Sequence, residues 1–212
     1  MLYFPLQMGH YVTYNVDSIY YNSGVCTKVE HTSQAKYIVS DTFRDNEDRL
    51  SYIIDVQYRA TVNDNWVKQS VVLVTSTDTG VTYGQGGLYT TKLIYPLTAG
   101  AKWYPNTFIP TGDSSLQYLS TWTSSYLAAG FKQPYNTGTI YFDNTITVLE
   151  DDETINNTIP DSITFNYRSY AKEIYAHGVG MVYRENTRLT YDPNVSECIG
   201  GISVTMSAVD HN

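Results

Sequence analysis

The sequence of 212 residues lacks any apolar run that approaches the roughly 18 residues of a membrane-spanning helix. It also lacks a basic segment followed by an apolar one at its start, so no signal peptide is visible. This pattern fits either a cytoplasmic protein or an exported one whose leader is missing. The two cysteines, Cys26 and Cys198, have neither Cys-x-x-Cys spacing nor a nearby histidine cluster, which disfavours a zinc site. They form either one disulfide in an oxidising compartment or two thiols, and the sequence leaves both open.

Basic residues are also scarce. The chain has 13 Lys and Arg against 21 Asp and Glu, which gives a net charge of −8. A nucleic-acid partner is therefore not expected, because neutralising phosphates requires clustered basic side chains. An anionic membrane surface is not expected to attract the chain electrostatically either, so any membrane contact would need a lipid anchor.

Catalytic motifs are absent as well. The histidines show no His-x-x-x-His spacing, and no Gly-x-Ser-x-Gly elbow anchors a hydrolase triad. His177 stands beside two glycines and is the best candidate for a general base, but a single loop histidine without a motif companion is usually structural. The sequence therefore predicts no catalytic residue, no cofactor and no metal site.

The glycine pair in "AHGVGMVYREN", Gly178 and Gly180, could suggest a phosphate loop. The dinucleotide fingerprint needs a third glycine where Tyr183 stands, and it needs a helix afterwards. An alternating pattern of apolar and polar residues follows instead, which indicates a strand. We expect these glycines to form the turn before that strand.

What the sequence does contain is tyrosine, 21 residues of it, together with strict alternation of apolar and polar positions. The alternation is clearest in residues 12–20, 52–60 and 140–148, and it is typical of strands with one wet face. About ten to twelve such strands are expected at this spacing. The predicted fold class is all-β, with an antiparallel curved sheet forming a barrel or half-barrel, lipocalin-like or lipoprotein-carrier-like, and little helix.

Turn residues separate the expected strands. Chain reversals are predicted at four segments: "YNSGV" (21–25), "VNDNW" (62–66), "TDTGV" (77–81) and "EDDET" (150–154). The acidic run "RDNEDR" (44–49) could hold Ca²⁺ through its carboxylates, but it lacks the EF-hand order and is bracketed by arginines. A solvated hairpin tip is the favoured interpretation of this run and of "EDDE".

Residues 114–129 are ambiguous. Tyr118, Trp122 and Tyr126 are four apart, as on a helix face, but they also share strand parity. Ser, Thr and aromatic residues fill the segment, which favours a strand.

A short pattern occurs twice, as "FPLQMGHYV" (4–12) and "YPLTAGAKW" (95–103). It indicates either an internal duplication or one strand-entry turn that is used twice. We expect a single β domain over residues 1–212, which an internal duplication would divide into two related halves at 1–94 and 95–212.

Aromatic side chains are the best remaining indication of a binding site. Trp66, Trp103, Trp122 and Tyr126 could form a stacking platform for sugars or line a cavity for an apolar ligand. The alternative is that these rings are core residues and cross-strand pairs, in which strands are enriched.

Four motifs together resemble a group of Bacteroidetes envelope lipoproteins: "YFPLQMGHYVTYNVDSIYYN", "TKLIYPLTAGAKWYPN", "YFDNTITVLEDDE" and "EIYAHGVGMVYRE". The resemblance spans most of the chain and implies export by a lipoprotein signal and tethering to the cell envelope. No active-site residue carries over, because the shared motifs are structural. The leader and the lipid-bearing cysteine of that group are not in this sequence.

Three functions follow as hypotheses. The first is a non-enzymatic envelope lipoprotein that binds a hydrophobic or glycan ligand or an envelope component. The second is a structural or interaction protein without a small-molecule ligand. The third is a glycan hydrolase with paired carboxylates drawn from separate strands, such as Asp55 or Asp143.

Overall fold

The computed structural model describes residues 2–109, 116–156, 166–191 and 199–212. Its twelve strands form one antiparallel sheet, in the order β6-β5-β4-β3-β2-β1-β12-β11-β10-β9-β8-β7. The strands are β1 (Tyr11–Asn22), β2 (Thr27–Arg44), β3 (Leu50–Arg59), β4 (Val67–Ser76), β5 (Gly80–Gln85), β6 (Leu88–Ile94), β7 (Lys102–Trp103), β8 (Ser124–Asn136), β9 (Tyr141–Asn156), β10 (Asn166–Ala176), β11 (Gly180–Tyr191) and β12 (Ile199–His211). The predicted all-β, barrel-like fold class is confirmed.

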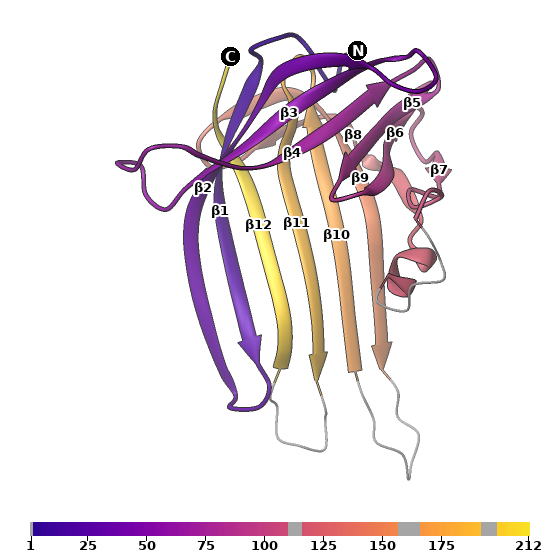
Figure 1. Cartoon of the computed structure of the whole chain (residues 1–212). Coiled ribbons are helices and arrows are strands. Elements are labelled where there is room, and N and C mark those ends of the chain that lie inside the picture. The colour runs from indigo at the N-terminus through magenta and orange to yellow at the C-terminus, as the bar shows by residue number, and fades with distance from the viewer. Residues whose placement is uncertain (1, 110–115, 157–165, 192–198) are drawn as a thin grey trace.

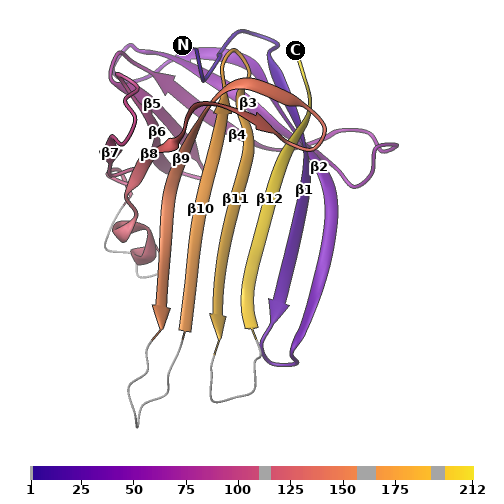
Figure 2. The same cartoon turned by 180° about the vertical axis from the view of Figure 1, so that it is seen from behind.

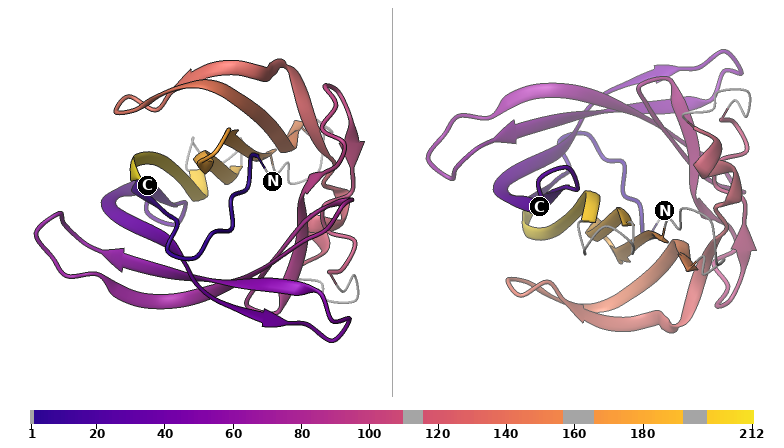
Figure 3. Two further views of the ribbon diagram at one scale, coloured as in Figure 1. Left: turned by 90° about the horizontal axis from the view of Figure 1, so that it is seen from above. Right: turned by 90° about the horizontal axis from the view of Figure 1, so that it is seen from below.

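The molecule has two levels. In its upper part the sheet curls into a nearly closed barrel, seen from above and below in Figure 3. In its lower part only the long strands β1, β2 and β9–β12 continue, as an open curved sheet (Figures 1 and 2). Both chain ends lie at the upper end of the molecule (Figure 1). Barrel and half-barrel, which the sequence left as alternatives, are therefore both present in the same sheet.

The alternation predicted from the sequence places one face of each strand in the core. Val12 and Tyr14 of β1 are buried and pair with Tyr37 and Ala35 of β2. The barrel core contains mainly β-branched and aliphatic side chains with almost no exposed surface, among them Val72, Val74, Val81, Leu93, Ile146 and Val148. Each such side chain contributes roughly 1.5–3 kcal/mol of transfer free energy on burial.

The barrel is closed at the seam between β6 and β7 by a few specific contacts and not by a continuous ladder. The Thr91 amide donates to the Pro105 carbonyl (2.8 Å), and the Trp103 indole N–H donates to the Thr91 carbonyl (2.8 Å). The Tyr126 hydroxyl accepts from the amide of Ile94 (2.8 Å) and donates to the carbonyl of the same residue (2.7 Å). One tyrosine thus satisfies both backbone groups of an edge residue.

The repeated motif forms the same turn twice. Gly9 and Gly100 have φ values of +81° and +80°, a region that favours glycine. Gly9 N–H donates to Val39 and Val39 N–H donates to the carbonyl of His10, both at 2.9 Å. In the second copy, the Gly100 N–H donates to the Tyr126 carbonyl (2.8 Å), and the Tyr126 N–H donates to the Ala101 carbonyl (3.1 Å). In each copy the turn leads the chain into hydrogen bonds with the edge of a neighbouring strand. This geometry is that of a strand-entry turn.

Most predicted turns lie where they were expected, between β1 and β2, β3 and β4, and β4 and β5. The prediction for 150–154 is wrong, because these residues lie inside β9 and pair with β10. Their charges have partners within the sheet: Glu150 contacts Lys92, and Asp152 contacts Arg168 at 2.5 Å. Because these acidic side chains pair with cations of other strands, the run can lie inside a strand and does not have to form a solvated turn.

The ambiguous segment divides in two. Gln117–Thr121 forms a 3₁₀ helix, and Ser124–Asn136 forms β8, so the preference for strand holds only for the second part. Residues 114 and 115 lie outside the described residues. Among the described residues no helix is long and apolar enough to cross a membrane. The expected single domain, 1–212, and its halves, 1–94 and 95–212, remain predictions, although all twelve strands join in one sheet.

Cys26 is disulfide-bonded, and Cys198 lies outside the described residues. Because the sequence has two cysteines, we expect non-reducing peptide mapping to recover a Cys26–Cys198 cross-link. Cys26→Ser should lower the free energy of unfolding by about 2–5 kcal/mol, since the bond constrains a long loop in the unfolded chain. A Cys26–Cys26 cross-link between two chains, or an unchanged denaturation midpoint in the serine variant, would contradict this prediction.

Candidate functional site

The N-terminal segment lies across the upper mouth of the barrel (Figure 3). The amide of Gly178 donates to the carbonyl of Leu2 (2.6 Å), and the Tyr3 hydroxyl donates to the side-chain oxygen of Asn144 (2.7 Å). Gly180 faces the ring of Pro5, at 3.5 Å from where its Cβ would be. The glycine pair therefore lies at the β10–β11 turn, as predicted, and contacts the N-terminal segment.

A buried cluster of charged side chains lies inside the barrel, formed by β6, β9, β10 and β11. The Lys92 ammonium donates to Glu150 (2.7 Å) and to Glu173 (2.8 Å). Arg184 donates to the same Oε1 of Glu173 through Nε (2.7 Å) and pairs through its terminal nitrogen (2.6 Å). The Tyr175 hydroxyl donates to the other Glu173 oxygen. Glu173 thus links three side chains, and its own side chain is fully buried.

The electrostatics of the two carboxyl groups differ. Burial raises the pKa of Glu150, and the nearby Glu173 carboxylate raises it further. Burial by itself would also raise the pKa of Glu173, but Arg184 and Lys92 outweigh it and bring the pKa to about 2. Burial lowers the pKa of Lys92, whereas the two glutamates raise it by more, so Lys92 stays charged. The cluster is therefore two cations held by two carboxylates, of which Glu150 is the first to take up a proton.

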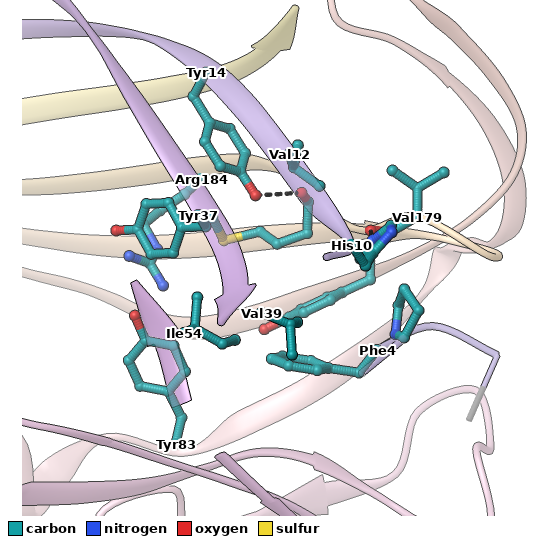
Figure 4. Close-up of a pocket in the computed structure, with 14 residues that line it drawn as sticks. Phe4, His10, Val12, Tyr14, Tyr37, Val39, Ile54, Tyr83, Val179 and Arg184 are labelled. Atoms are coloured by element: carbon teal, nitrogen blue, oxygen red, sulfur yellow. Dashed lines mark hydrogen bonds between the residues drawn. The ribbon is translucent and has the colours of Figure 1, made fainter. Parts of the chain in front are cut away.

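A cavity of about 60 Å³ lies between this cluster and the N-terminal segment. Figure 4 shows Arg184 next to Tyr37 and Tyr83 on one side, and Phe4 with Val39 on the other. The Tyr14 hydroxyl donates to the Met181 carbonyl (2.7 Å) at its rim. Small-molecule sites usually measure roughly 300–1,000 Å³. This cavity has room for a few water molecules and none for an acyl chain.

The aromatic residues predicted as ligand contacts are not gathered into one platform. Trp103, Trp122 and Tyr126 are buried, and the rings of Trp103 and Tyr126 pack together with centroids 4.8 Å apart. Trp66 lies in the β3–β4 turn, where its ring stacks under the Arg59 guanidinium at 4.3 Å. All three rings lie in the core: Trp103 and Tyr126 point inward from β7 and β8, and Trp122 lies between the 3₁₀ helix and β8.

The residues considered for catalysis are also separated. Asp55 on β3 accepts from Ser40 and pairs with Lys68, both at 2.8 Å, whereas Asp143 is exposed on β9. The His177 ring contacts the Tyr3 ring edge-on, with centroids 5.5 Å apart. Glu150 and Glu173 form a closer carboxylate pair, but both bind Lys92 and are buried.

The larger concavity lies on the other face of the sheet, between the β2–β3 turn and the β5–β6 hairpin. Its volume is about 530 Å³, within the range of small-molecule sites. Side chains of β4 and β5, among them Leu73, Thr75 and Thr82, form its floor. Two largely exposed aromatic rings line it, Tyr89 of β6 (41% exposed) and Phe108 after β7 (62% exposed). We call this concavity the outer groove.

A glycine sets the orientation of one of these rings. Gly84 of β5 pairs with Tyr89, and a Cβ added to Gly84 would come within 2.4 Å of the Tyr89 ring. The Tyr89 ring therefore lies against the backbone of β5, in space that the Cβ of any residue other than glycine at position 84 would occupy. This contact holds the ring over the sheet and leaves its opposite face available to the groove.

The rim of the outer groove carries balanced charge. Asp45 accepts from the Arg49 guanidinium (2.8 Å) and from the amides of Glu47 and Arg49 (2.9 Å each). Arg49 also pairs with Glu47 at 3.0 Å. The predicted hairpin tip is thus an ordered turn whose charges pair with each other. Such a rim offers hydrogen bonds to a neutral polar ligand without a strong field of either sign.

Sequence reasoning missed both the ion cluster and the outer groove. Arg184 is one of the polar residues in the alternating pattern after Gly180, and its side chain reaches Glu173 inside the barrel. Bulges next to Lys172 and Tyr175 displace the register of β10, which alternation alone does not reveal. A usable signal for the groove was the Gly84–Tyr89 pair flanking "GG" in a short hairpin, where an aromatic residue covers a glycine.

No protein-family model matches the chain, and no curated protein sequence matches it. Among solved structures, it is similar to a "putative exported protein with YmcC-like fold" from Bacteroides fragilis, at 12% identity and a TM-score of 0.51, covering 100% of this chain and 99% of that one. A "putative lipoprotein" from Parabacteroides distasonis matches at 15% identity and a TM-score of 0.34, covering 100% and 98%. At these identities the likeness concerns the fold alone, and only the first score supports it. The chain therefore shares the YmcC-like fold of the Bacteroides fragilis protein.

Proposed function

We propose that this protein is a non-enzymatic component of the cell envelope that binds a neutral glycan in the outer groove. The observation that carries the proposal is the pair of exposed rings, Tyr89 and Phe108, beside a rim of paired charges in a groove of about 530 Å³. Sugar rings present apolar C–H faces and polar edges, and a site with aromatic faces and hydrogen-bonding groups suits both.

Export is supported by a disulfide, by a neighbour of the same fold and by the sequence motifs. Cys26 is disulfide-bonded, and disulfides persist mainly in oxidising compartments such as the periplasm and the cell surface. The Bacteroides fragilis protein of the same fold is described as exported, and the sequence motifs resemble envelope lipoproteins of Bacteroidetes. The proposed location is therefore the cell envelope.

The groove favours a neutral ligand over a charged or an apolar one. Two arginines and two acidic residues line it, and Arg49 is bound by both Asp45 and Glu47. The chain as a whole has a net charge of −8, which repels acidic polymers. The cavity between the ion cluster and the N-terminal segment measures about 60 Å³, which is too small for an acyl chain.

Binding can be tested with neutral linear oligosaccharides built on glucose, mannose, galactose and N-acetylglucosamine, using saturation-transfer NMR and calorimetry. At least one series should bind, and Tyr89→Ala should weaken it about 5- to 30-fold, since truncating a contact ring costs about 1–2 kcal/mol. Gly84→Ala should weaken binding similarly, because its Cβ displaces the Tyr89 ring.

The matched control is Tyr104→Ala, which removes a ring that is 72% exposed in the neighbouring loop but does not line the groove. It should leave affinity unchanged. If no series binds, or if Tyr104→Ala and Tyr89→Ala behave alike, the groove is not a glycan site. The alternative, an interaction protein without a small-molecule ligand, would then be preferred.

A further inference from the structure

The lower part of β2 has a free edge. β3 pairs with β2 only from Gln34 onwards, so Thr27–Ser33 pair with β1 on one side and with nothing described on the other. Figure 1 shows this part of β2 at the margin of the sheet, with no strand beyond it. Residues 27–32 are all exposed, and the segment contains no proline. An exposed edge of this kind is a template for pairing with another strand.

The ladder determines which residues offer hydrogen bonds at this edge. Both backbone groups of Val39 bond to residues on the β1 side, Gly9 and His10. Backbone groups in a strand alternate in direction, and the β1–β2 register continues without a shift from residue 38 to 27. The backbone N–H and C=O groups of odd-numbered residues therefore point to β1. Those of the even-numbered Lys28, Glu30 and Thr32 point outward.

This edge is complementary to itself in one register. In an antiparallel pair with a two-fold axis at Val29, each Lys28 lies opposite Glu30 of the other copy, as a hydrogen-bonded pair. The two Val29 side chains, each 63% exposed, then lie opposite each other. A two-fold axis at Glu30 would instead oppose two carboxylates, which is destabilising. Charge therefore selects the register centred on Val29.

We propose that two copies of this chain associate through the Thr27–Ser33 edges of β2, in the antiparallel register centred on Val29. The sheet then continues from β1 and β2 of one copy into β2 and β1 of the other. Lys28 and Glu30, which pair within one chain at 2.7 Å while largely exposed, exchange into two ion pairs between chains. The shared edge is short, so the dimer is weak and its population depends on concentration.

Charge reversal tests the register. Sedimentation equilibrium from about 1 µM to about 1 mM should show a monomer–dimer equilibrium. Lys28→Glu places four carboxylates together and should weaken dimerisation at least about tenfold, as should Glu30→Lys with four ammonium groups. The double variant K28E/E30K restores both pairs and should return the dimer constant to within about threefold. A monomer at all concentrations, or a double variant no better than either single one, overturns the proposal.

A cross-link tests the two-fold axis directly. Opposed residues in a non-hydrogen-bonded pair have Cα atoms about 4.5 Å apart, which suits a disulfide. Under mild oxidation Val29→Cys should give a covalent dimer whose 29–29 peptide is found by mass spectrometry. His31→Cys is the matched control, since residue 31 faces Thr27 of the other copy in this register. Efficient 31–31 cross-linking without 29–29 would refute the Val29 register.

Discussion

Glu173→Gln is expected to lower the free energy of unfolding by about 3–5 kcal/mol, measured by urea denaturation near neutral pH. Glu173 accepts hydrogen bonds from Lys92, Arg184 and Tyr175 and has no solvent exposure. Its neutralisation removes the carboxylate partner that the buried Lys92 shares with the mostly buried Arg184, and Lys92 keeps its ion pair with Glu150. Breaking a buried ion pair from one side costs far more than the pair contributes as a whole, because the remaining charge stays desolvated.

The control for this variant is Asp152→Asn. Asp152 pairs with Arg168 at 2.5 Å, but half of its side-chain surface is exposed. Solvent screens such a pair, so its loss should cost less than about 1 kcal/mol. Equal losses in the two variants would mean that the interior cluster is not the dominant electrostatic element of the barrel.

The pH dependence of this difference follows from the pKa of Glu173. Its value falls from 4.5 to about 2 on folding, because Arg184 and Lys92 outweigh the burial that would raise it. A carboxyl with a depressed folded pKa stabilises the protein above its unfolded pKa, and the stabilisation is lost as pH falls. The gap between wild type and Glu173→Gln, about 3 kcal/mol from this shift, should therefore be full above pH 4.5 and narrow toward pH 2. A constant gap over this range would contradict the assignment.

The contribution of Glu150 to the pH dependence of stability has the opposite sign. Burial and the neighbouring Glu173 raise its pKa, so its ionised form is disfavoured in the folded protein. Protonation of Glu150 therefore favours folding as pH falls through its raised pKa. On acidification the Lys92–Glu150 ion pair is therefore neutralised before the Lys92–Glu173 ion pair.

Tyr126→Phe is the second substitution with a large expected effect, a loss of about 2–4 kcal/mol in the free energy of unfolding. The Tyr126 hydroxyl bonds to both the amide and the carbonyl of Ile94 at the barrel seam. Without it these two backbone groups have lost their partner, and each buried unsatisfied group costs about 1–3 kcal/mol. Denaturation with urea measures the loss.

Hydrogen exchange localises the same effect, because the Ile94 amide should lose protection in Tyr126→Phe while the amides of β10 and β11 keep theirs. Tyr126→Ala should cost about 3–5 kcal/mol for the ring alone, in addition to the hydrogen bonds. Tyr141→Phe is the matched control, since the Tyr141 ring is 65% exposed, and its stability should stay within about 0.5 kcal/mol. Unchanged exchange at Ile94 would show that the seam is held by other contacts.

Tyr126, one of the residues predicted to contact a ligand, lies in the core of the barrel. From the sequence, Tyr126 and the tryptophans were the richest supply of aromatic surface. Nothing local distinguishes a ring that faces a ligand from one that faces the opposite wall of a barrel. That distinction depends on how far the sheet curls, which results from many strands together.

The sequence by itself determined the all-β class, the strand alternation in β1 and β3 and the two strand-entry turns at Gly9 and Gly100, because these depend on side-chain periodicity and on local φ. The tertiary structure alone decided that the Arg184 side chain of β11 reaches inside the barrel, that Glu173 joins Lys92 and Arg184, and that Tyr89 and Phe108 share one groove. These pairings join residues distant in the chain, and bulges change which face a residue occupies. Periodicity reports only that a strand has two faces, and the closure of the sheet decides which one becomes the inside.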